Sequence, residues 1–152
     1  MVDADTERFT VAVFQDVQWA AKGLSALKDA GFSADMFSIM AKDSPDASAL
    51  VEKTFAAKGD RLEIANIGAV VAHGSIVGAL QGSARDLGKI GIAGTMRRVG
   101  FQPHDGRIFE TLTGRGGVLV AIRTEPRAAD ALAILFSYGG GNAAIGAWTG
   151  RV

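Results

Sequence analysis

The chain has 152 residues, of which 48% are hydrophobic, and its sixteen basic residues balance sixteen acidic residues. This length favours a single domain with a substantial core, and zero net charge removes any bulk attraction to nucleic acid or to an anionic membrane. Cysteine is absent, which excludes disulfides, thiolate metal sites and cysteine nucleophiles. Residues 1–8 are polar and acidic and lack the segments of a signal peptide, so we expect a disordered tail and a cytoplasmic protein.

The first predicted unit runs strand, helix, strand. Residues 9–15 (FTVAVFQ) are β-branched and aromatic, as in a strand covered on one or both faces. Asp16 is placed to cap a helix whose buried face includes Leu24 and Leu27, and Gly31 is placed to end it. A second strand is predicted over 36–40.

The middle of the chain predicts helices. Ser44, Pro45 and Asp46 form a helix start, with a hydroxyl cap and proline in the first turn, and that helix should run to about residue 58. A longer helix is predicted over 61–84 and a broken one over 86–99. Pro103 should begin a short helix that ends at Gly114, with Ile108, Phe109 and Leu112 facing inward.

The two ends of the chain repeat each other. Residues 11–42 align with 119–150 at a constant offset of 108, without a gap. The second copy predicts a strand over 117–123, a helix that begins near Pro126, and a strand over 142–148. Two such units predict one ferredoxin-like α+β domain over residues 9–152, with a four-stranded antiparallel sheet and a helical glycine-rich insert at about 44–114.

A stripe of glycines is the most unusual feature of the insert. Gly74, Gly78 and Gly82 recur every four residues, so on the predicted helix they would line one face beside Val71. Glycine costs about 1 kcal/mol relative to alanine at each helical position, and close approach of another helix would offset that cost. We therefore expect Gly74, Gly78, Gly82 and Val71 to form a self-association surface like a glycine zipper, in a homo-oligomer that is most simply a two-fold dimer.

Two alternative functions remain open. Residues 64–84 contain no charge and are long enough to span a bilayer, but their polar residues and glycines bring the insertion free energy near zero. A helix in the lipid interface over residues 64–96 would make the protein a peripheral membrane module. A cleft between the sheet and the insert would instead make it a small-molecule sensor or enzyme.

No group of residues reaches the standard of a catalytic or metal site. His73 and His104 have no acidic cluster nearby in the sequence, and the glycine runs at 114–117 and 139–141 lead from a helix into a strand, opposite to a phosphate loop. The arginines at 97, 98, 107 and 115 lack interleaved aromatic residues, so we predict no nucleic-acid partner. We expect no enzymatic activity, no cofactor and no bound metal.

Residues 9–42 and 99–140 resemble the bacterial general stress protein domain family. The resemblance rests on the opening strand, the alanine-rich helix and its glycine, on the hydrophobic glycine-rich middle, and on the Gly-Gly pair that leads into VLVAIR. It implies a small stress-associated protein and supplies no catalytic residue. The chain departs from the family at residues 104–107 (HDGR), where more acidic residues are usual.

Overall fold

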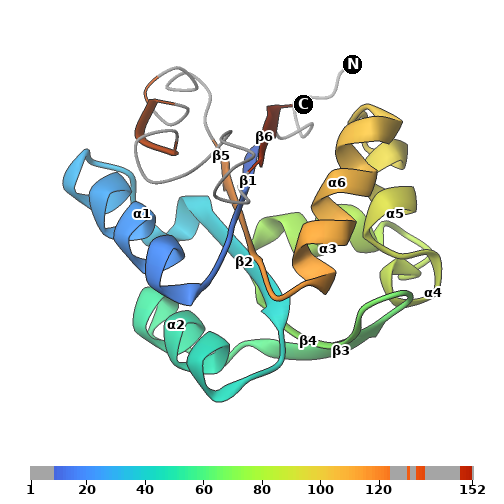
Figure 1. The fold of residues 1–152 in the computed structure, drawn as a ribbon, viewed down its shortest axis with the longest axis horizontal. Helices are drawn as coiled ribbons and strands as arrows, with labels where there is room; N and C mark the ends of the chain where they lie inside the picture. Colours follow the sequence, from blue (N-terminus) through green and yellow to red (C-terminus); the bar gives the residue numbers. More distant parts are fainter. Residues whose placement is uncertain (1–8, 124–129, 131–132, 136–147, 152) are drawn as a thin grey trace.

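The computed structural model describes residues 9–123, 130, 133–135 and 148–151. The fold is α+β, and over these residues one antiparallel sheet has the strand order β3-β4-β2-β5-β1-β6 (Figure 1). The strands are β1 (Phe9–Phe14), β2 (Phe37–Lys42), β3 (Asp60–Ile64), β4 (Gly68–His73), β5 (Val118–Arg123) and β6 (Trp148–Arg151). The helices are α1 (Val17–Asp29), the 3-10 turn η1 (Ala34–Met36), α2 (Pro45–Phe55), α3 (Ser75–Gln81), α4 (Leu87–Ile90), α5 (Ile92–Arg98) and α6 (Pro103–Gly114).

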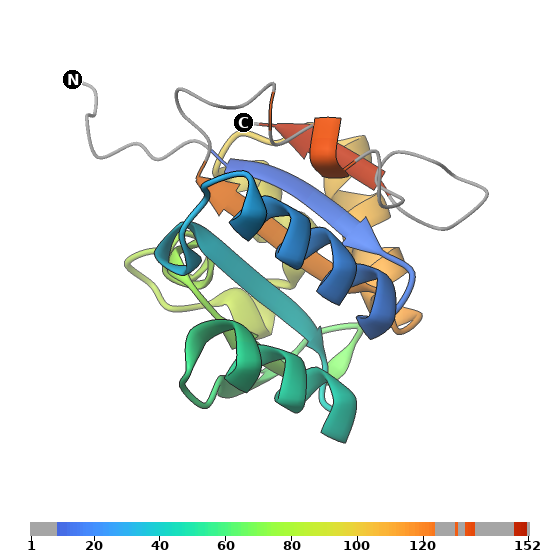
Figure 2. The ribbon, with the colours of Figure 1, turned by 90° about the vertical axis from the view of Figure 1, so that its left-hand side faces the viewer.

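Helices cover both faces of the sheet. Figure 2 shows α1 and α2 lying across one face, while Figure 1 shows α3 to α6 on the other. Successive side chains of a strand point to opposite faces, so β1 sends Ala12 and Phe14 into the core under α1 and α2. Its Val11 and Val13 enter the core under the insert helices. Every residue of β1 is therefore buried.

The predicted helix caps of the first half are confirmed. The Asp16 carboxylate accepts a hydrogen bond from Trp19 N at 2.9 Å, and Ser44 Oγ accepts one from Ala47 N at 3.0 Å. After α1 the backbone turns at Gly31, whose φ of 99° suits glycine. The predicted helix from Pro103 to Gly114 is also confirmed. Of the three residues expected to face inward, Phe109 is fully buried, whereas Ile108 and Leu112 are half-buried.

The repeat is visible in the sheet. Ala12 of β1 lies opposite Val120 of β5, and these two residues are equivalent under the 108-residue offset. The outer pairings are less regular. Ser38 of β2 lies opposite Ala121 of β5, so the 108-residue offset would place residue 146 opposite Val13 of β1. The structure places Trp148 of β6 opposite Val13 instead. A shift of two residues preserves which face each side chain occupies. The predicted second helix and the turn at 139–142 lie largely outside the described residues, apart from helical positions at 130 and 133–135.

The prediction of one helix over 61–84 is wrong, and the insert is therefore not wholly helical. Residues 60–73 form the hairpin β3–β4, which extends the expected four strands to six over the described residues. The hairpin turns at Asn66 (φ 72°) and Gly68 (φ 98°), two residue types that tolerate positive φ. Arg61 and Glu63 are exposed while Leu62 and Ile64 face the core, a period of two that belongs to a strand.

Helix α4 covers part of the sheet edge at β3. Ala65 N donates to the carbonyl of Gly88 at 2.8 Å, and a Cβ on Gly88 would lie 2.5 Å from the carbonyl oxygen of Glu63. Glycine is needed at 88 because the two backbones approach so closely. An uncovered edge strand offers free hydrogen-bonding groups to other chains, and α4 removes part of that hazard.

Candidate functional site

The structure separates the three glycines of the predicted stripe. Gly74 precedes α3 with φ 118°, and a Cβ there would lie 2.5 Å from Ser38 Cα. Gly82 ends α3 with φ 62°. Positive φ favours glycine, so Gly74 and Gly82 are explained by the fold of their own chain and do not share a helical face with Gly78.

Gly78 has no such explanation. It lies in the middle of α3, it is exposed, and a Cβ built on it meets nothing within 4 Å. Glycine inside a helix costs about 1 kcal/mol relative to alanine, and no contact within the described residues offsets that cost. Its missing side chain leaves the backbone of α3 open to an approaching surface.

Gly78 lies in a hollow between α3 and the start of β3, which we call the β3–α3 hollow. The hollow has a volume of about 460 Å³ and is lined by Asp60, Arg61, Leu62, Gly74, Val77, Gly78, Gln81 and Arg85. Its walls come from β3, to which Asp60, Arg61 and Leu62 belong, and from α3 with its N-cap Gly74, while Arg85 lies in the segment between α3 and α4. The rim carries both signs of charge. Arg61 forms an ion pair with Asp43 at 3.1 Å, whereas Arg85 has no ion pair with any described residue.

Two buried or partly buried hydrogen bonds fix the position of α3. At its start, Ser38 Oγ on β2 accepts from Ile76 N at 3.1 Å in a buried contact. At its end, Arg98 Nη2 donates to the Leu80 carbonyl at 2.6 Å. Ser38 was not singled out from the sequence, although a single serine within the apolar run FSIMA is a signal that could have found it.

Arg98 is itself held by a carboxylate. Its two terminal nitrogens contact Asp86 at 2.8 and 3.1 Å, a paired geometry that strengthens an ion pair. The hydrogen bond from Arg98 lowers the pKa of Asp86 below its ordinary value of 3.8, and the same contact raises the pKa of Arg98. Arg98 thus joins α3 to α5, whereas its neighbour Arg97 is exposed.

Val71, the fourth predicted site residue, does not line the hollow, and neither do the two histidines, for which no site was predicted. Val71 is buried in the core beneath α1 and α2, so its side chain is not on the surface of this chain. The His73 ring packs against the ring of Phe55 at a tilt of 43°, with centroids 4.4 Å apart, and His104 lies on the exposed side of α6. Gly116, with φ 102°, forms the turn between α6 and β5.

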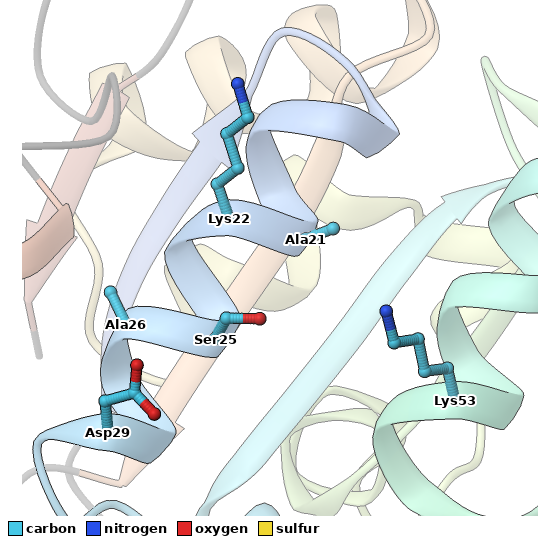
Figure 3. A pocket seen from close by; sticks show the side chains of 6 residues that line it. All are labelled: Ala21, Lys22, Ser25, Ala26, Asp29 and Lys53. Carbon is cyan, nitrogen blue, oxygen red and sulfur yellow. The ribbon is translucent and has the colours of Figure 1, made fainter.

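Two shallower hollows lie on helix surfaces. One, of about 620 Å³, follows the outer face of α1 and is lined by Ala21, Lys22, Ser25, Ala26, Asp29 and Lys53. Figure 3 shows Lys22, Ser25 and Asp29 on α1, with Lys53 reaching from α2 on the other side of the gap. The second follows the outer face of α6 and includes His104. The first combines lysines with an acid and a hydroxyl but has no buried polar group directed into it.

The apolar residues of the insert are mostly buried in the core of the protein. Ile76, Leu80, Met96 and Phe109 fill the space between the sheet and the insert helices, where the small-molecule alternative would need a cleft. Over residues 64–96, Ile90 is the exposed large hydrophobic residue, at 46%. In the described part of the chain, no helix has the length and apolar character needed to cross a bilayer.

The described residues contain no group of three or more histidine, aspartate or glutamate side chains that could hold a metal ion. Comparison of the chain with protein-family models, with curated proteins and with solved structures finds no match. The resemblance to the general stress protein family remains a prediction.

Proposed function

We propose that this protein is a non-enzymatic, stress-associated interaction protein that associates with copies of itself through the β3–α3 hollow. The observation that carries the proposal is the exposed glycine at 78, whose would-be Cβ has no neighbour within 4 Å. A helix of a second copy packed at this point would give the bare backbone a partner and offset the cost of glycine.

The charges of the hollow favour a second copy as the partner. A two-fold interface brings the same patch together twice, so it must be complementary to itself. Asp60 supplies a negative charge while Arg61 and Arg85 supply positive charges on the same rim. Across a two-fold axis Arg85 of one copy would face Asp60 of the other, and α3 helices would cross near Gly78.

We also propose that the duplicated part of the fold is a ferredoxin-like unit. The support is the order β2-β5-β1-β6, in which the two copies of the repeat contribute alternate neighbours, all antiparallel. In this proposal the β3–β4 hairpin and α3 to α6 are additions to that unit, and they carry the association surface. The two-fold dimer would then place the additions at its centre.

The replacement Gly78→Leu tests the association. Nothing lies within 4 Å of the new Cβ, so the fold of the chain accepts the side chain while close approach of another helix is blocked. We expect the wild-type protein to sediment as a dimer at high concentration, and Gly78→Leu to sediment as a monomer at the same concentration. At a dilution where both proteins are monomeric, the thermal midpoint of Gly78→Leu should be no lower than that of the wild type, because leucine is a better helix former than glycine. Ala49→Leu, on the exposed surface of α2, is the control and should retain the wild-type mass.

Two results would refute the proposal. One is a wild-type protein that stays monomeric at every concentration. The other is a Gly78→Leu protein that keeps the wild-type mass, because the hollow would then not be the contact surface.

A further inference from the structure

The exposed face of α6 carries a groove lined by two arginines, Arg107 and Arg115, that form no ion pair with any residue the structure describes. The groove has a volume of about 340 Å³ and is lined by His104, Arg107, Ile108, Thr111, Leu112 and Arg115. These residues recur at spacings of three and four, so they share one side of the helix. Among the residues that the structure describes, the lining contains no carboxylate, although the whole chain has as many acids as bases.

The two arginines of the groove, like Arg85, lack the ion pairs that Arg61 and Arg98 form with described residues. Arg61 and Arg98 each form an ion pair with an aspartate, at 3.1 and 2.8 Å. Arg107 and Arg115 form no ion pair with any described residue, and both are exposed. Their hydrogen-bond donors therefore face solvent, where an anion can reach them.

Donors and apolar groups lie in two parallel rows along the groove. Arg107, Thr111 and Arg115 follow one another at intervals of four residues, which places the arginines about 12 Å apart along the axis with the hydroxyl between them. Ile108 and Leu112 form the adjacent row and are half-buried. Both guanidinium groups can turn toward an anion above Thr111 while a carbon chain lies on the apolar row.

We propose that this groove binds a water-soluble organic phosphate, namely a phosphomonoester with a short apolar group. The guanidinium fork matches the oxygens of a phosphate and binds them with two parallel hydrogen bonds. The volume, at the low end of the range for ligand sites of about 300–1,000 Å³, exceeds what a phosphate alone would fill. The proposal is independent of the association surface, because α6 contributes no residue to the β3–α3 hollow.

Butyl phosphate and inorganic phosphate are the probes for this site. We expect butyl phosphate to cause saturable shifts of backbone amide NMR signals over residues 104–115, and inorganic phosphate to bind more weakly. Replacing both Arg107→Gln and Arg115→Gln should weaken butyl phosphate binding by about tenfold or more, since each charge-assisted hydrogen bond is strong. Glutamine is a good helix former, so α6 should persist. Arg97→Gln, on the exposed side of α5, is the control and should bind like the wild type.

Several outcomes would overturn the proposal. Equal binding by the double variant and the control would show that the groove arginines are not involved. Equal affinity for inorganic phosphate would remove the role of Ile108 and Leu112. Binding to vesicles that contain phosphatidic acid, with no response to butyl phosphate, would assign this face to membranes instead of a soluble ligand.

Discussion

Replacing Gly88 by alanine, alongside the same replacement at Gly78, separates local helix preference from tertiary packing. Both glycines lie inside short helices, α4 and α3. From the helix preference of the residues alone, each replacement should stabilise the protein by about 1 kcal/mol. The surroundings of the two positions predict opposite results.

The difference arises from the contact between α4 and β3. A Cβ at residue 88 would lie 2.5 Å from the Glu63 carbonyl oxygen, whereas ordinary contact begins at 3.4 Å. Overpacking of this kind costs about 1–3 kcal/mol, which cancels or exceeds the helix gain. Gly78→Ala meets no atom within 4 Å and keeps its full gain. The free energies of unfolding of the two variants should therefore differ by about 2 kcal/mol.

Urea unfolding of dilute protein, at concentrations where sedimentation shows a monomer, measures this difference without a contribution from association. The corresponding separation of thermal midpoints is about 4–8 °C. Because α4 also covers the edge at β3, Gly88→Ala should aggregate faster on heating. A Gly88→Ala protein as stable as Gly78→Ala would refute the close contact between α4 and β3.

Two further predictions concern the bonds that hold α3. Ser38→Ala leaves the buried Ile76 N–H without its acceptor and should lower the free energy of unfolding, measured by urea unfolding, by about 1–3 kcal/mol. Ser25→Ala, on the exposed side of α1, is the control, and equal stability of the two variants would contradict this role of Ser38. Arg98 lowers the pKa of Asp86 in the folded protein. The ion pair therefore stabilises the folded state fully at pH values above 3.8, the ordinary pKa of the carboxyl group. This stabilisation is lost as the pH falls through the lowered pKa of the folded protein. The thermal midpoint of Asp86→Asn should lie below that of the wild type at pH 7 and approach it at the acid end, and a difference independent of pH would show that the carboxylate charge is not involved.

The elements that were predicted correctly are those with local signals. Asp16, Ser44 and Pro103 each start a helix through chemistry that acts within a few residues. The repeat likewise predicts which strands are equivalent, and Ala12 and Val120 meet at the centre of the sheet. Capping and apolar periodicity require no knowledge of distant residues.

The hairpin at 60–73 shows why the middle of the chain was harder to predict. Val70, Val71 and Ala72 are apolar on both faces because helices cover both sides of β4. A short apolar run of this kind is compatible with a buried helix as well as a buried strand. The alternation of exposed and core-facing residues from Arg61 to Ile64 is too short to distinguish the two. Residues 68–73 form a strand because they pair with β2, which is distant in the sequence.

The sequence alone therefore determined the helix boundaries near its capping residues, the duplication, and the excess of glycine in the insert. It could not assign a cause to each glycine, because the causes are contacts between distant segments. Only the folded chain places Ser38 against Gly74 and Glu63 against Gly88 while leaving Gly78 open. Tertiary structure decided these roles because steric exclusion depends on which backbone lies within a few ångströms, and spacing along the chain carries no information about that distance.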